Sequence, residues 1–145
     1  QAFLARGPAA SRPASQLESG GKMAQILVVE DETALVDVIT TALTARGHTV
    51  LHAYDGQRGL DTALRERPAL IIADHMLPLM TGLELCRAVK REHPEPPIPF
   101  LLMTAGNVPV EDSCPDAVLL KPFRIEDLES QVDALLQTRA PSFFG

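Results

Sequence analysis

The hydrophobic positions of the chain fall into two alternating patterns. Five short apolar runs, rich in Val, Ile and Leu, are typical of strands that a parallel sheet buries on both faces. These runs are Gln25–Val29, Thr49–Ala53, Ala69–Ala73, Phe100–Met103 and Ala117–Leu120. Elsewhere apolar residues recur every three or four positions, which predicts the helices Thr33–Arg46, Asp55–Arg67, Thr81–His93 and Ile125–Arg139. This alternation indicates an α/β fold with right-handed crossovers and helices on both faces of a parallel sheet.

The apolar spacing also predicts which face of each helix points inward. In the first helix the expected inward residues are Leu35, Val38, Ile39, Ala42 and Leu43. In the later helices they are Leu60, Ala63 and Leu64, then Leu85, Cys86 and Val89, and finally Ile125, Leu128, Val132, Leu135 and Leu136. Gly47 and Pro68 are expected to end the first two helices.

The 145 residues suit one domain with one flanking segment at each end. Residues 1–22 are rich in Ala, Ser, Gly and Pro, have no helical or strand period, and are interpreted as a disordered leader or expression-vector remnant. The folded domain is expected over 23–139, beginning at Met23, and residues 140–145 are expected to form a short tail.

Charge and cysteine content narrow the function. The formal net charge of −6 argues against a general nucleic-acid backbone binder, which needs clustered Lys and Arg. No apolar run approaches the ~20 residues that span a bilayer, so we expect a cytoplasmic protein without membrane contact. Cys86 and Cys114 lack metal-ligand spacing. They could pair, but nothing in the sequence requires it, and we expect reduced thiols, one on a helix and one in a loop.

Residues able to carry chemistry follow four of the five predicted strands. They are Glu30 and Asp31 after the first strand, Asp74 after the third, Thr104 after the fourth and Lys121 after the fifth. In an open parallel sheet, ligands bind at this carboxyl edge. Two like charges ~4 Å apart repel by ~4 kcal/mol at an effective dielectric of 20, so the carboxylates need a divalent cation or the lysine beside them. Oxygen ligands suit Mg²⁺, and a carboxylate beside such cations can attack a phosphoryl donor.

Each residue alone has a simpler reading. Asp31 could instead cap the first helix, Thr104 could be a turn residue and Lys121 a surface lysine. Glu32 is interpreted as a first-turn helix acid that the helix dipole favours. The joint occurrence of Glu30 or Asp31 with the other groups at successive strand ends favours a shared site.

Four segments resemble bacterial response-regulator receiver domains, the two-component phosphoacceptors of the CheY-like family. They are ILVVEDE at 26–32, IIADHMLPLMTG at 71–82, LLMTA at 101–105 and LLKPF at 119–123, and the resemblance covers about residues 25–138. It implies a flavodoxin-like, doubly wound sheet of five parallel strands in the order 2-1-3-4-5. It also implies a cytoplasmic role in phosphorelay signal transduction.

The resemblance further implies a role for each site residue. Asp74 would accept the phosphoryl group, and Glu30, Asp31, Asp74 and the backbone carbonyl of Met76 would hold Mg²⁺, the one cofactor expected. Thr104 would sense the phosphoryl group.

Lys121 would pair with the phosphoryl group, and the Lys121–Pro122 bond is expected to be cis, as in the family. The implied donor is a histidine kinase or a phosphotransfer protein, and the implied output is altered binding of an unknown partner protein, without direct contact to nucleic acid. Such a domain is not an enzyme, although it assists its own phosphorylation and dephosphorylation.

This sequence departs from the family pattern at two places. Val118 occupies the position, three before the lysine, where the family usually has an aromatic residue. The interval from Thr104 to Lys121 is short, so we expect the fourth helix to be lost or reduced to a turn. Met76 and Gly106, at positions that influence access of hydrolytic water, cannot orient a water molecule, which predicts slow self-dephosphorylation.

Two other functions compete with the phosphoacceptor. Val118 and the short segment 105–116 would suit a pseudo-receiver, a protein-interaction module that works without phosphorylation. An aspartate-nucleophile phosphatase would need a general acid two residues beyond Asp74, where Met76 cannot donate a proton. Titration with acetyl phosphate or beryllofluoride and Mg²⁺ distinguishes the first alternative, and turnover of a phosphomonoester would reveal the second.

Overall fold

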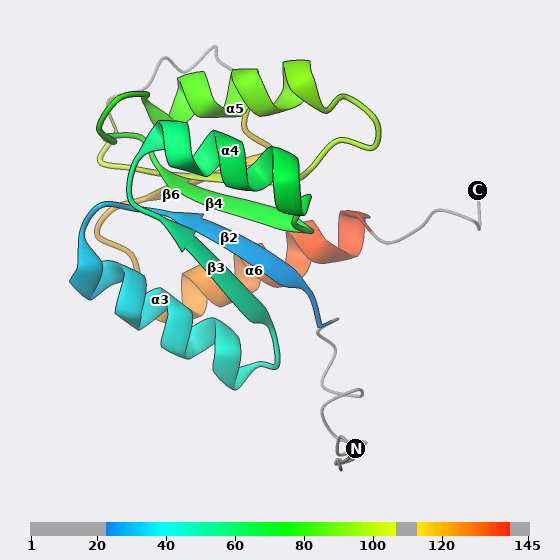
Figure 1. Ribbon diagram of the computed structural model, residues 1–145. Helices are drawn as coiled ribbons and strands as arrows, with labels where there is room; N and C mark the ends of the chain where they lie inside the picture. Colours follow the sequence, from blue (N-terminus) through cyan, green and yellow to red (C-terminus); the bar gives the residue numbers. More distant parts are fainter. Residues whose placement is uncertain (1–22, 107–112, 140–145) are drawn as a thin grey trace, which may run out of the picture.

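A computed structural model describes residues 23–106 and 113–139 of the chain (Figure 1). Its sheet has five parallel strands: β2 (Gln25–Val29), β3 (Thr49–Ala53), β4 (Leu70–Asp74), β5 (Phe100–Thr104) and β6 (Ala117–Leu120). The spatial order is β3-β2-β4-β5-β6, which is the predicted 2-1-3-4-5. The segments 1–22 and 140–145 lie outside the described residues, so the expected domain boundaries stay predictions.

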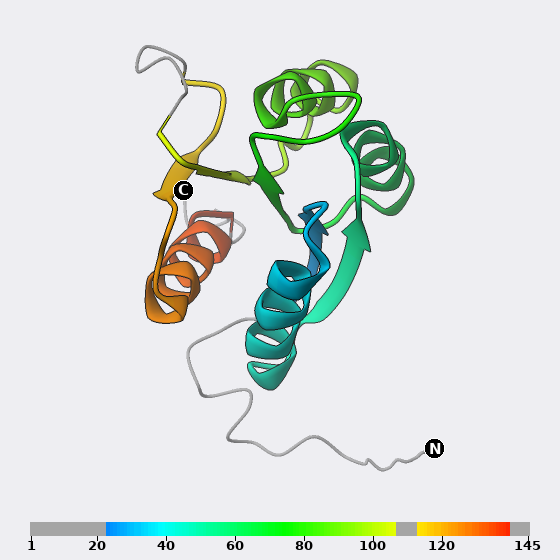
Figure 2. The ribbon, with the colours of Figure 1, turned by 90° about the vertical axis from the view of Figure 1, so that its left-hand side faces the viewer.

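Four helices accompany the sheet: α3 (Thr33–Ala45), α4 (Gly56–Glu66), α5 (Gly82–Glu92) and α6 (Ile125–Arg139). α3 and α6 cover one face of the sheet, and α4 and α5 cover the other (Figures 1 and 2). Among the described residues no helix lies between β5 and β6, which agrees with the expected loss or reduction of the fourth helix. Residues 107–112 of this connection are outside the described part. None of the helices in the described ranges is long and apolar enough to cross a membrane.

The core forms one layer on each face of the three central strands. β4 and β5 are buried along their whole length, and β2 is buried from Ile26 onward. The edge strand β6 is less covered, since Val118 and Leu120 are 42% and 61% exposed. The carboxyl ends of β2, β4 and β5 therefore belong to buried strands, which hold the backbone of the residues at these ends in place.

The prediction for the inward face of α3 was partly wrong. Val38 is 54% exposed, whereas Val36, which we did not expect inside, is buried beside Ile39 and Leu43. Apolar residues occupy so much of this helix that the sequence does not fix its rotation about its own axis. Val36, Ile39 and Leu43 are the residues that the helix buries against the sheet, and Leu35 lies half-buried beside them.

The expected ends of the first two helices are confirmed. Gly47 follows α3 with a φ of +94°, a left-handed conformation that glycine adopts without steric cost. α4 ends at Glu66, and Arg67 takes a left-handed φ of 48° before Pro68. Both turns return the chain directly to the next strand.

Candidate functional site

Three carboxylates gather at the carboxyl edge of the sheet. Glu30 directly follows β2 and Asp31 comes next, while Asp74 is the last residue of β4. One oxygen from each carboxylate lies within 4.8 Å of the others. Glu30 is 1% and Asp74 6% exposed, whereas Asp31 is exposed. The cluster thus opens to solvent on the Asp31 side.

Lys121 reaches this cluster from the end of β6. Its Nζ atom lies 3.2 Å from Asp74 Oδ2 and 3.4 Å from Glu30 Oε1. Its backbone N–H donates to the carbonyl of Thr104 at 2.8 Å, which continues the β5–β6 pairing for one more residue. When all four groups are ionised, one ammonium faces three carboxylates, so the site retains negative charge.

Burial and charge shift the acidity of two of these groups. Desolvation raises the pKa of Glu30 to about 7, and the neighbouring Asp74 charge acts in the same direction, against the Glu32 N–H and Lys121. For Lys121, desolvation lowers the pKa, but the charges of Glu30 and Asp74 outweigh it and raise the pKa overall. Lys121 therefore stays cationic, while the Glu30 carboxyl has a pKa of about 7.

Two glycines fit the loop after Asp74 tightly against the site. A Cβ atom on Gly82 would lie 2.5 Å from the Asp74 carbonyl oxygen and 2.8 Å from His75 Cα. The Gly82 N–H donates to the His75 carbonyl at 2.9 Å. A Cβ on Gly56 would lie 2.5 Å from the Met80 backbone oxygen. Gly56 was not among the predicted site residues, although a glycine in the first turn of the predicted helix Asp55–Arg67 was the available signal.

The start of α5 is fixed by its own side chains. Thr81 Oγ1 accepts from the Glu84 N–H, and the Glu84 carboxylate accepts from the Thr81 N–H, a reciprocal capping box. Because Gly82 is the first residue of this helix, the cap also fixes the backbone that packs under Asp74. Thr81 was not among the predicted site residues, although the Thr-x-x-Glu pattern at 81–84 was the available signal.

Thr104 is the last residue of β5 and is 2% exposed. Its Oγ1 atom accepts a hydrogen bond from the Gly106 N–H at 3.2 Å. One residue earlier, Met103 stands in register with Asp74 on the neighbouring strand. The backbones of Thr104 and Asp74 therefore lie on adjacent strands at the same edge.

Other expectations for single residues have different outcomes. The Lys121–Pro122 bond is cis, as expected. Asp31 does not cap α3, because Glu32 occupies the N-cap position. This corrects the interpretation of Glu32 as a first-turn acid: the helix begins at Thr33, as predicted, and Glu32 lies just before its first turn. Met76 is 68% exposed, so its side chain lies outside the cluster.

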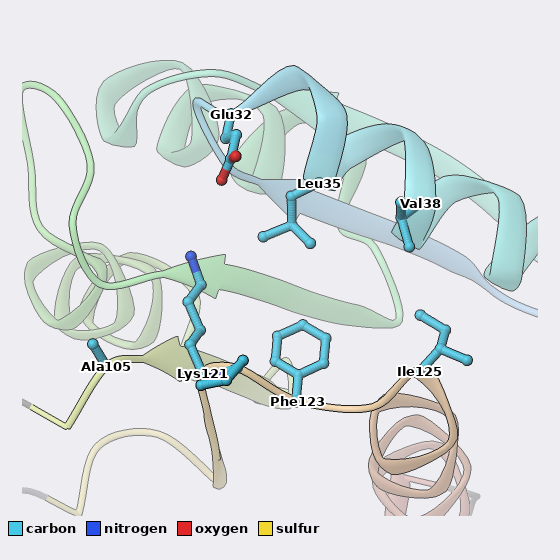
Figure 3. Close-up of a pocket in the computed structure, with 8 residues that line it drawn as sticks. Glu32, Leu35, Val38, Ala105, Lys121, Phe123 and Ile125 are labelled. Atoms are coloured by element: carbon cyan, nitrogen blue, oxygen red, sulfur yellow. The ribbon is translucent and has the colours of Figure 1, made fainter.

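An apolar groove of about 520 Å³ adjoins the charged cluster. Figure 3 shows Leu35 and Val38 of α3 pointing across a gap toward Phe123 and Ile125, with Lys121 at one end. The remaining lining residues are Glu32, Ala105 and Pro122. Val38, misassigned to the core, is thus part of a surface that begins beside the site.

This fold and this edge define a class of small signalling domain. The family model described as "Response regulator receiver domain" matches residues 26–133, and the chain belongs to that family.

Several individual proteins are similar to the chain. The chain is similar to the response regulator ArlR of Staphylococcus aureus, with 40% identity over 120 residues. This match covers 79% of the chain and 53% of the relative, so the chain spans about half the length of the curated relatives it matches. The chemotaxis response regulator CheY4 of Vibrio cholerae is similar in structure, with a TM-score of 0.72, 28% identity, and coverage of 79% of this chain and 99% of that one.

A further similar protein has a solved structure with a bound magnesium ion. It is the receiver domain of the sensor histidine kinase PA1611 from Pseudomonas aeruginosa PAO1, described with a magnesium ion coordinated in its active-site cleft. The TM-score is 0.71 and the identity 25%, over 80% of this chain and 99% of that one.

Proposed function

We propose that this domain accepts a phosphoryl group on Asp74 from a phosphohistidine of a histidine kinase or phosphotransfer protein, and thereby alters the binding of an output protein. The observation that carries the proposal is the position of Lys121 Nζ, 3.2 Å from Asp74 Oδ2, at the edge where three carboxylates meet. Membership of the receiver family supports the same chemistry.

The residues present fit a magnesium ion. Glu30, Asp31 and Asp74 offer only oxygen ligands, which a hard divalent cation prefers, and the opening at Asp31 leaves room for water ligands. The negative charge left beside Lys121 favours a divalent ion over none. The backbone carbonyl of Met76 is the further proposed ligand. When bound, Mg²⁺ would supply positive charge to the oxygens of the transferring phosphoryl group.

The chain's own groups account for the other requirements of the transfer. A carboxylate oxygen of Asp74 forms the bond to phosphorus while the P–N bond to the donor imidazole breaks. Lys121, kept cationic by its neighbours, pairs with a phosphoryl oxygen. The Thr104 hydroxyl can turn from Gly106 and donate a hydrogen bond to another oxygen.

The decisive experiment is phosphorylation by a small donor. Acetyl phosphate with Mg²⁺ should add one phosphoryl group to the protein, detected by intact mass, and Asp74→Asn should abolish it. Asp61→Asn, which makes the same change at an exposed carboxylate of α4 outside the cluster, serves as the matched control and should keep it. Labelling that persists in Asp74→Asn would overturn the proposal.

The groove beside Lys121 offers a surface for the protein donor. The donor must bring its phosphohistidine to Asp74, and Leu35, Val38 and Phe123 supply apolar contact within the same edge of the molecule. A small donor such as acetyl phosphate needs no such contact. Substitution in the groove should therefore separate the two kinds of donor.

The proposed phosphoaspartate should be long-lived. Met76 is exposed and apolar, and Gly106 has no side chain, so neither can orient a hydrolytic water. We expect slow loss of label from purified phosphoprotein in a phosphatase-free buffer. Rapid loss there would contradict this part of the proposal.

No observation among the described residues favours the phosphorylation-independent alternative over the phosphoacceptor. Val118, which motivated it, lies on β6 with its side chain partly in solvent and leaves the charged cluster intact. Under the alternative, beryllofluoride with Mg²⁺ would leave partner binding and the protein's spectra unchanged.

A further inference from the structure

Two cysteines far apart in the sequence meet beside the short β5–β6 connection. Cys86 lies in α5 and Cys114 lies in that connection, 28 positions later. The Cys114 thiol donates to the Cys86 sulfur at an Sγ–Sγ distance of 2.8 Å, and both are present as thiols. Cys86 is buried, whereas Cys114 is half-buried and within reach of solvent. A disulfide needs 2.05 Å, a closure of about 0.8 Å.

The surroundings hold these two thiols together. Asp116 accepts a hydrogen bond from the Phe100 N–H at 2.8 Å and donates its own N–H to the Phe100 carbonyl at 2.9 Å. Its carboxylate also pairs with Lys90 of α5 at 3.1 Å. Lys90 lies one helical turn after Cys86, and Asp116 lies two residues after Cys114. Both ends of the thiol contact are therefore tied to the same framework.

We propose that Cys86 and Cys114 form a redox modification site, which a hydroperoxide converts into an intramolecular disulfide and a dithiol reductant restores. The proposal does not depend on phosphoryl transfer to Asp74. Disulfides in reducing compartments are rare, and those that form there are usually transient and redox-sensing.

The chemistry balances in two steps. The more accessible Cys114 attacks a peroxide oxygen, the O–O bond breaks, and a sulfenic acid and an alcohol or water result. The Cys86 sulfur then attacks the Cys114 sulfur, the S–O bond breaks, and the oxygen leaves as water with the Cys86 proton. Burial raises the pKa of the Cys86 thiol and slows this attack. The 2.8 Å distance between the two sulfur atoms compensates for this slower attack, because reacting atoms held within about 3.5 Å have a large effective concentration.

The cross-link would fasten the β5–β6 connection to α5. That connection begins directly after Thr104, and its far end leads through β6 to Lys121. Oxidation would thus restrain the segment between two residues of the charged edge without using either of them.

The test uses the complete chain, first reduced and then exposed to a small excess of hydrogen peroxide. The intact protein should lose the mass of two hydrogen atoms, and a tryptic digest without reductant should contain one peptide joining Cys86 to Cys114. A thiol reductant should reverse both changes. The cross-link should form at least about tenfold faster in the folded chain than in urea, because folding supplies the proximity.

Single substitutions show which cysteine reacts with peroxide first. Cys86→Ser should accumulate a sulfenic acid on Cys114 that dimedone traps, and Cys114→Ser should leave Cys86 reduced at the same peroxide dose. The proposal is overturned if both thiols of the folded wild-type chain remain open to alkylation after peroxide treatment. Disulfide-linked dimers as the sole product, or equal rates in the folded and urea-unfolded chain, would also overturn it.

Discussion

Withholding Mg²⁺ while raising the pH should destabilise this fold through Glu30. Burial raises the pKa of this carboxyl from 4.5 to about 7, a difference of about 2.5, and each pKa unit corresponds to 1.36 kcal/mol. Between these two values the folded chain holds a proton that the unfolded chain has released. The favourable contribution is therefore complete below pH 4.5 and lost as the pH rises through 7. The expected loss in the free energy of unfolding is about 3 kcal/mol.

The assay is urea unfolding followed by circular dichroism in chelator, at intervals from pH 4.5 to pH 8.5. Other groups titrate in this range. The informative quantity is therefore the difference in the free energy of unfolding between the wild type and Glu30→Gln, which cannot ionise at this position. That difference should change by about 3 kcal/mol across the range and level off above it.

Magnesium provides the second arm of the same experiment. Saturating Mg²⁺ at pH 8 should restore the stability of the wild type, because binding to the folded state alone stabilises it by about 2.7 kcal/mol at one hundred times the dissociation constant. Glu30→Gln should gain much less. A difference curve that is flat with pH, or an equal gain for both proteins, would refute the reasoning from burial and charge.

Three further outcomes are expected. Gly82→Ala should lower the free energy of unfolding by about 1–3 kcal/mol in urea titrations, because its Cβ would overlap the Asp74 carbonyl; the stabilisation that alanine gives at an open helix position would contradict the packing. Burial lowers the pKa of His48, so the stability that this residue contributes is present above pH 6.5 and lost as the pH falls. In His48→Gln the free energy of unfolding should therefore fall less steeply below pH 6.5 than in the wild type, and an equal fall in both proteins would contradict the assignment. Val38→Glu should slow phosphoryl transfer from a protein donor at least about tenfold while acetyl phosphate labelling persists, whereas Thr44→Glu, exposed and outside the groove, should leave both rates unchanged.

The order of the elements could be predicted from the sequence because strand and helix periods differ so clearly. Short β-branched runs such as Gln25–Val29 have few alternatives between helical segments. The rotation of α3 could not be predicted in the same way. Leu35, Val36 and Val38 are similar in hydropathy, and only the shape of the sheet decides which of them it buries.

The composition of the candidate site could be predicted, but its energetics could not. Strand ends identified Glu30, Asp74 and Lys121, since parallel strands bring their carboxyl ends to one edge. The sequence did not reveal that Glu30 is almost completely buried, which is the cause of its raised pKa. The contact between Cys86 and Cys114 was equally hidden, because two thiols 28 positions apart meet only if the intervening chain folds back.

Val118 restricts how a change at the charged edge can be transmitted through β6. A β-branched side chain on a strand has few χ1 rotamers, so it cannot swing between an inner and an outer position as a longer ring can. A change at this strand is then expected to involve its main chain and not the Val118 side chain alone. Among the described strands β6 pairs with β5 alone, so no second strand ladder in that part of the chain opposes such a movement.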